Sequence, residues 1–195
     1  QREKIGQRLL SGVKQAAEIA CIDYMGAAFA GYLDTLSFWR ALNYQPVSLG
    51  FKADPVAGSG SVMVIMGVTS AGKKMADCLS QRLAQQIISR LRDELEWVSL
   101  DLLALLLEKE SVLMYCTLTD LEKMDVQAFA VGHKPLPLAK ASLMKWILRK
   151  LVTGQLDQLD KHQKEAFKKQ VFLSAPSSLR VDEVKALKKQ IAPLL

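Results

Sequence analysis

The chain has 195 residues, half of them apolar and about a quarter charged, which is typical of a globular protein that buries a real core. No apolar run reaches the roughly 20 residues that a membrane span needs, and the start lacks the apolar segment of a secretory signal. The net charge is +6 and its whole excess lies in residues 140–195, where 12 basic residues outnumber 5 acidic ones. Such asymmetry indicates either an anionic partner such as nucleic acid or a solvated, lysine-rich helix face.

Residues 1–69 alternate between helical and strand patterns. The glycine at position 6 predicts a turn at the very start, and residues 5–17 predict a helix with Leu9, Leu10, Val13 and Ala17 on one side. Strands are predicted over 22–30, 46–50 and 61–68, a short helix over 33–42, and a loop over 52–60. This order predicts an α/β domain over residues 1–69.

From residue 70 onward the pattern is helical. Apolar residues recur every four positions from Met75 to Leu95, which indicates a long amphipathic helix. Ser99 is a candidate cap for a second helix, and Thr119 with Glu122 forms a capping-box pattern for a third. Further helices are predicted over residues 138–152, 155–170 and 181–191. We therefore expect an all-α domain over residues 70–195.

The cysteines and histidines indicate neither disulfides nor a metal site. Cys21, Cys78 and Cys116 are odd in number and widely spaced, as in a protein of the reducing cytoplasm. His133 and His162 have no potential ligand at metal-binding spacing. We expect a cytoplasmic protein that binds no metal and does not enter a membrane; its oligomeric state stays unknown.

The order of the first segment, a glycine turn followed by helix, strand, helix and two strands, resembles the second half of the GNAT acetyltransferase fold. In that fold the turn binds the pyrophosphate of acetyl-CoA through backbone N–H groups, which a helix N-terminus makes available. Its pattern is Gln/Arg-x-x-Gly-x-Gly/Ala. Gln1 and Gly6 fit this pattern, whereas Lys4 stands where the first glycine belongs.

Longer stretches resemble one family with this fold, the bacterial tRNA(Met) cytidine acetyltransferases. Its helix carries an acidic residue four positions before a Phe-Trp pair, as Asp34 does before Phe38 and Trp39. The family also has an Ala-Phe-x-x-x-His-Arg-Pro-Leu run, similar to residues 128–136 here. The resemblance covers roughly residues 1–150. It implies that the chain is a C-terminal fragment, with half of the acetyltransferase domain and a helical tail domain.

The resemblance implies an activity. These enzymes transfer acetyl from acetyl-CoA to the exocyclic amine of the wobble cytidine of elongator tRNA(Met), and they use ATP in a helicase-like module N-terminal to the acetyltransferase domain. That module and the leading strands of the sheet have no counterpart in this sequence. We therefore expect the fragment alone to be inactive. The chemistry would depend on positioning the amine and thioester, and the catalytic base is unknown.

The resemblance also implies which residues meet the cofactor. The positions that would cradle the CoA pyrophosphate are Gln1, Arg2, Glu3, Lys4, Ile5, Gly6 and Gln7, and Asp34 takes the place of the acidic residue near acetyl-CoA. Asp34 is explained equally well as an acidic residue placed to suit a helix dipole. The family has an arginine seven positions after this acid, where the chain has Ala41, with Arg40 one position earlier.

Lysines of the last two predicted helices are the candidate RNA-binding residues. Helical spacing places them on common faces, and cations on phosphates give sequence-independent affinity for RNA. They are Lys161, Lys164, Lys168 and Lys169 in one helix, and Lys185, Lys188 and Lys189 in the other.

Two other functions stay open. One is an acetyl-CoA-dependent transferase that acts on a protein or a small amine, although the basic tail favours RNA. The other is a non-catalytic, basic RNA-binding module. This alternative stays open because Lys4 and Ala41 differ from the family pattern.

Overall fold

The computed structural model describes residues 2–50, 52, 58–91, 97–173 and 180–195, with side chains from residue 5 onward. The chain divides into two compact units, which we call the sheet unit (Gln1–Ile87 and Leu105–Leu107) and the helical unit (Ile88–Ala104 and Glu108–Leu195). The predicted boundary at residue 69 falls where a long helix begins, whereas the compact units divide near the end of that helix.

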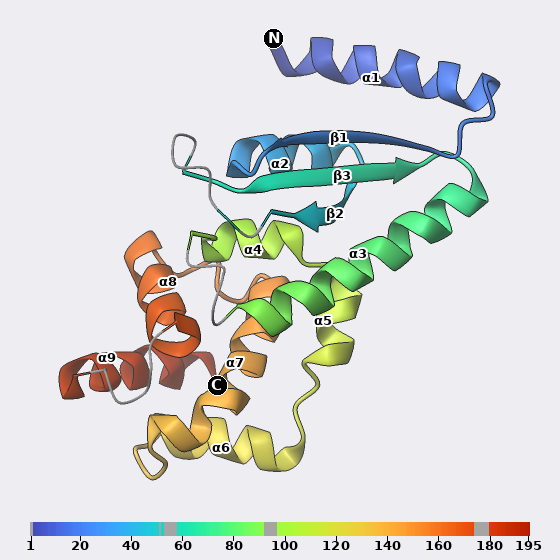
Figure 1. Cartoon of the computed structure of the whole chain (residues 1–195). Helices are drawn as coiled ribbons and strands as arrows, with labels where there is room; N and C mark the ends of the chain where they lie inside the picture. Colours follow the sequence, from blue (N-terminus) through green and yellow to red (C-terminus); the bar gives the residue numbers. More distant parts are fainter. Residues whose placement is uncertain (1, 51, 53–57, 92–96, 174–179) are drawn as a thin grey trace. The chain divides into compact units, whose positions relative to one another are not determined.

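Three antiparallel strands form the sheet: β1 (Tyr24–Ala30), β2 (Gln45–Leu49) and β3 (Ser61–Gly67). Figure 1 shows β3 between the other two strands, in the order β1-β3-β2. Val62 and Val64 of β3 are fully buried, as the apolar run over residues 61–68 predicts. Pro46 lies on β2 beside a register shift, where a residue without an N–H donor disturbs the ladder least.

The first helix, α1 (Arg2–Ile19), begins earlier than expected. The predicted turn over residues 1–6 is wrong, because Gly6 lies inside the helix. A Cβ on Gly6 would lie 3.4 Å from the Phe38 ring of α2 (Leu33–Ala41), an ordinary van der Waals contact, so Gly6 faces this ring from inside α1. Of the predicted apolar face, Ala17 is buried but Leu9 is 69% exposed.

A tight junction joins β3 to α3 (Ser70–Arg90). The Thr69 hydroxyl donates to the Asp23 carboxylate over 2.5 Å and accepts from the N–H of Gly72 over 3.1 Å. The Asp23 carbonyl accepts from the N–H of Val68 over 2.8 Å. The loop before β1 is thereby tied to the start of α3.

The buried face of α3 agrees with the predicted apolar row at Leu83 and Ile87 and differs from it at the start of the helix. It consists of Gly72, Ala76, Ser80, Leu83, Ala84 and Ile87. Met75, the first residue of the predicted apolar row, is 36% exposed. Small residues allow this face to lie close to its neighbours, and a hydrophobicity pattern is insensitive to small residues.

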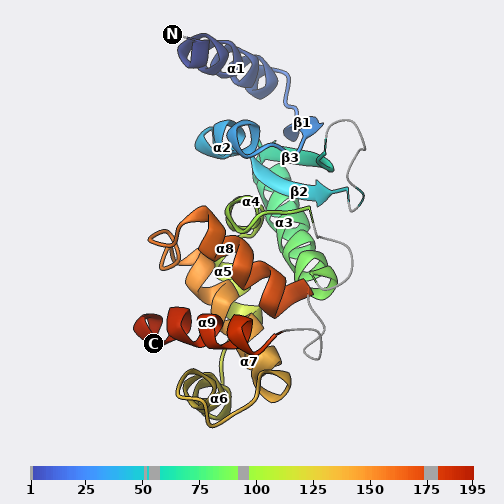
Figure 2. The same cartoon turned by 90° about the vertical axis from the view of Figure 1, so that its left-hand side faces the viewer.

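The remaining elements are helical (Figure 2). They are α4 (Leu100–Leu106), α5 (Lys109–Tyr115), α6 (Asp120–Ala130), α7 (Leu136–Val152), α8 (Lys161–Phe167), a π-helical turn η1 (Lys168–Leu173), α9 (Val181–Ile191) and a 3-10 turn η3 (Ala192–Leu194). Within the helical unit α6 packs along α7, whose Leu143 and Ile147 are fully buried.

Local capping explains several of these helix ends. Ser99 accepts from the N–H of Leu102 over 3.1 Å, and Thr119 forms the predicted capping box with Glu122. The single helix predicted over residues 155–170 is wrong at its start. Residues 153–158 form turns, and Asp160 caps α8 by accepting from the N–H of Gln163 over 2.8 Å.

Candidate functional site

A groove of about 200 Å³ lies on the sheet unit, where α1 faces the end of α2. We call it the α1–α2 groove. From α1 it is lined by Gln7, Leu10, Ser11 and Lys14, and from the other side by Ala41, Leu42, Asn43, Tyr44 and Met66.

The residues that follow the end of α2 form one side of the groove. Asn43 has a φ of 63°, a left-handed conformation that asparagine tolerates better than most residues. Its N–H donates to the carbonyl of Arg40 over 3.0 Å, and that of Tyr44 donates to the carbonyl of Trp39 over 3.1 Å. The reversal places Asn43 and Tyr44 beside α1.

Tyr44 is only 2% exposed, although it lines the groove. Its ring lies edge-on to that of Trp39, with centroids 4.7 Å apart, and Trp39 stacks on Phe29 of β1. Burial raises the pKa of the Tyr44 phenol above its ordinary value. The phenol therefore stays protonated at neutral pH, which makes it a hydrogen-bond donor and no base. These packed rings agree with a core role for Trp39 and Tyr44.

Of the predicted cofactor residues whose side chains are described, only Gln7 lines the groove. Gln7 lines the groove, Gly6 faces Phe38, and Ile5 is 69% exposed. Asp34 lies exposed in the first turn of α2 and does not line the groove. Gln1 lies outside the described residues, as do the side chains of Arg2, Glu3 and Lys4.

Position 41 lines the groove, whereas Arg40 does not. The resemblance implies an arginine at this position, where this chain has an alanine. Lys14 lines the groove as the single lysine among the side chains that the structure describes there, and sequence reasoning missed it. Its spacing could have indicated it, since residues 7, 11 and 14 follow each other at i, i+4 and i+7 on one helix face.

The predicted RNA-binding lysines do not form one exposed face. Lys164 lies 2.6 Å from the Asp101 carboxylate, and Lys168 is only 7% exposed and 3.7 Å from Glu165. The ammonium of Lys188 lies 5.3 Å from the centre of the Phe129 ring. Four lysines of the set are exposed: Lys161, Lys169, Lys185 and Lys189. The last two lie one turn apart on α9. Two of the predicted RNA-binding lysines, Lys164 and Lys168, therefore lie beside carboxylates of the helical unit.

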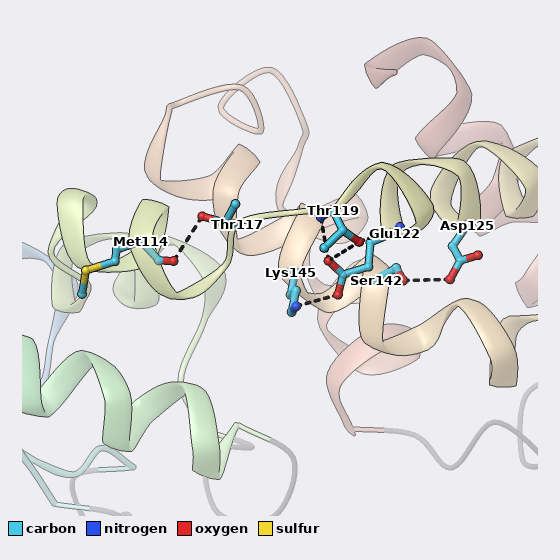
Figure 3. A network of polar contacts seen from close by, with 7 residues as sticks. All are labelled: Met114, Thr117, Thr119, Glu122, Asp125, Ser142 and Lys145. Carbon is cyan, nitrogen blue, oxygen red and sulfur yellow. Dashed lines mark hydrogen bonds and ion pairs between the residues drawn. The ribbon is translucent and has the colours of Figure 1, made fainter.

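A polar network ties α6 to α7 in the helical unit (Figure 3). Lys145 lies 2.5 Å from the Glu122 carboxylate, which also accepts from the N–H of Thr119. Asp125 accepts from Lys134 and, over 3.1 Å, from the Ser142 hydroxyl. The hydrogen bond from Lys145 lowers the pKa of Glu122, and that from Lys134 lowers the pKa of Asp125. The network fixes a helix pair.

Among the described residues, no three His, Cys, Asp or Glu side chains are grouped closely enough to hold a metal ion. Cys21, Cys78 and Cys116 are free thiols. No helix in the described part of the chain is long and apolar enough to cross a membrane.

Comparison with known proteins agrees with the resemblance inferred from the motifs. The chain is similar to proteins named tRNA(Met) cytidine acetyltransferase TmcA. That of Nitrosococcus halophilus is 26% identical over 69% of this chain and 18% of its own length. Those of Pectobacterium atrosepticum and Citrobacter koseri are 24% and 27% identical, over 75% and 76% of this chain and 21% and 20% of their own lengths.

The chain thus spans about a fifth of the length of the curated relatives it matches. No model of a known protein family matches it.

Proposed function

We propose that this chain is part of a tRNA cytidine acetyltransferase, with the sheet unit contributing to the acetyl-CoA site and the helical unit to tRNA binding. The observation that carries the proposal is the similarity to several such enzymes over about three quarters of the chain. The α1–α2 groove and the exposed lysines support the two roles separately.

The groove suits a cofactor with phosphates and an amide-bearing chain. Gln7, Ser11 and Asn43 offer uncharged hydrogen-bond donors, and Lys14 offers a cation that can pair with a phosphate. Leu10, Leu42 and Met66 supply apolar contact. These residues would bind and orient acetyl-CoA, which supplies the acetyl thioester. Asp34, exposed at the start of α2, would lie outside the groove.

The acceptor would be the exocyclic amine of a cytidine. Its lone pair is delocalised into the ring, so alignment of amine and thioester is the main contribution a protein can make. The protonated phenol of Tyr44 adds no base. We assign no catalytic base to this chain, and we expect the 195-residue chain to bind cofactor without transferring acetyl, because it matches only about a fifth of the length of its relatives.

Calorimetric titration of acetyl-CoA tests the cofactor assignment. Lys14→Gln should weaken binding about tenfold, as expected for the loss of one charge-assisted contact. Lys73→Gln is the matched control, because Lys73 is also an exposed helical lysine of the sheet unit but lies outside the groove.

Equal affinities for the two variants would place the cofactor elsewhere. An absence of binding to the wild-type chain, combined with tRNA binding, would instead favour a non-catalytic RNA-binding module, which Ala41 already suggests.

A further inference from the structure

A second pocket, of about 300 Å³, lies in the helical unit at the C-terminal end of α7. It is lined by Leu118, Lys123, Trp146, Arg149, Lys150, Thr153 and Gln155. Three of these residues are cationic and none is acidic. We call it the α7 pocket. None of its lysines belongs to the set that the sequence indicated for RNA binding.

Lys150 is the central cation of the pocket. Its ammonium lies 5.3 Å from the centre of the Trp146 ring, which holds it in place. Within residues 97–173 and 180–195 no carboxylate forms an ion pair with it. Burial lowers the pKa of Lys150, so the folded protein bears a desolvation cost at this position that an anionic ligand would offset.

Arg149 is oriented by the backbone. Its guanidinium donates to the carbonyl of Leu113 over 3.0 Å. A guanidinium has five N–H donors, so this single hydrogen bond orients the side chain and leaves further donors for a ligand. Lys123 pairs with Asp120 over 2.8 Å in an exposed contact, and such surface pairs exchange partners at little cost.

The usual explanation for basic residues at a helix C-terminus is that they compensate its unpaired carbonyls. Here the carbonyls of Arg149, Lys150 and Leu151 are already bonded. Gly154, with a φ of 72°, donates to Leu151, and Gln155 donates to Lys150 over 2.9 Å, in the pattern of a Schellman cap. The Thr153 hydroxyl donates to the carbonyl of Arg149 over 2.8 Å. Both basic side chains are thus free of a capping role.

We propose that the α7 pocket binds a ribose-phosphate group of an RNA chain, with the phosphate between Lys123, Arg149 and Lys150. The volume far exceeds the roughly 15 Å³ that one ordered water requires. Leu118 and Trp146 provide apolar contact for the sugar. The proposal rests on the RNA-binding part of the proposed function and assigns it a site.

Fluorescence anisotropy with labelled tRNA tests this site. The double variant Lys123→Gln/Lys150→Gln should bind at least tenfold more weakly than the wild-type chain, and the slope of log K against log salt should shrink by roughly one. Lys109→Gln is the matched control, because it removes an exposed lysine of the same unit outside the pocket. Lys150→Arg keeps the charge and should retain most of the affinity, which separates loss of a phosphate contact from loss of the fold.

A second titration uses cytidine monophosphate and inorganic phosphate. The proposal is overturned if tRNA binds the double variant and Lys109→Gln equally well, an outcome that leaves the proposed function intact. Binding of cytidine monophosphate that depends on Lys150, without binding of tRNA, would support a phosphate site but contradict the RNA-binding function. If wild-type chain binds neither tRNA nor nucleotide, both ideas fail.

Discussion

The backbone carbonyl of Asp23 occupies the position that a Cβ on Gly72 would need. This contact joins the loop before β1 to the first turn of α3, beside the bond between Thr69 and Asp23. The junction therefore tolerates only glycine at position 72.

Gly72→Ala should destabilise the chain by about 3 kcal/mol, the upper end of the cost of overpacking, because backbone atoms must move to admit the methyl group. Gly12→Ala is the control: no atom lies within 4 Å of its Cβ position inside α1, and the exchange should stabilise the helix by up to about 1 kcal/mol. Thermal unfolding by circular dichroism measures both. A Gly72→Ala variant as stable as the wild type would show that the junction is looser than described.

Glu108 should make the start of α5 sensitive to acid. Burial acts to raise the pKa of this N-cap carboxylate, but hydrogen bonds from Glu110 and Ser111, the shortest of them 2.6 Å, lower it to about 2. Because the folded-state pKa is lowered, the stabilisation is present above the ordinary pKa of about 4.5 and is lost as the pH falls toward 2.

Glu108→Gln should therefore cost about 1 kcal/mol at pH 7, as for loss of a cap, and the difference from wild type should shrink between pH 4.5 and 2. Urea unfolding at several pH values gives the comparison, with Asp157→Asn, a change at an exposed carboxylate outside this cap, as control. A deficit independent of pH would contradict an ionised cap.

The lysines of α8 and α9 should separate into two classes. Lys161→Glu with Lys169→Glu should weaken tRNA binding and flatten its salt dependence while leaving thermal stability unchanged, because both side chains are exposed. Lys164→Glu should lower stability, because it places a carboxylate against Asp101. Parallel measurement of melting temperature and tRNA affinity distinguishes the classes, and identical behaviour of the two variants would contradict the distinction.

Position 41 offers a gain-of-function test of the α1–α2 groove. Ala41→Arg restores a cation to the groove wall and should strengthen acetyl-CoA binding about tenfold. Introduction of arginine at the exposed position 37 (Ser37→Arg), on the same helix but outside the groove, is the control. Unchanged affinity in Ala41→Arg would argue against a phosphate near position 41.

Local signals predicted much of the fold. Ser99, Thr119 and Asp160 act within three residues of themselves, and the first two were recognised as caps from sequence alone. The buried strand β3 followed from its apolar run. Two predictions failed: Gly6 was interpreted as a turn from its residue type although it lies inside α1, and small residues concealed the buried face in the first turns of α3.

The candidate sites show the same division. Helical spacing predicted a common face for Lys161, Lys164, Lys168 and Lys169, but only the fold shows that Lys164 meets Asp101, 63 positions away in the chain. Gln7 was found through the family resemblance, whereas Asn43 and Tyr44 join it through a left-handed turn. The α7 pocket combines Trp146, Arg149, Lys150 and Thr153, which share one helix face by their spacing, with Leu118 and Lys123, which no spacing connects to them.

The strand order also governs how the sheet unit can fold. β3 is the last of the three strands in the chain but lies between the other two. Because both ladders of the sheet include β3, neither can form before residue 61 has been synthesised. Pairing with β1 joins positions more than 30 residues apart, which makes loop closure a slow step. Met66 of the α1–α2 groove arrives with the same strand, so a nascent chain acquires its candidate cofactor site only when its sheet closes.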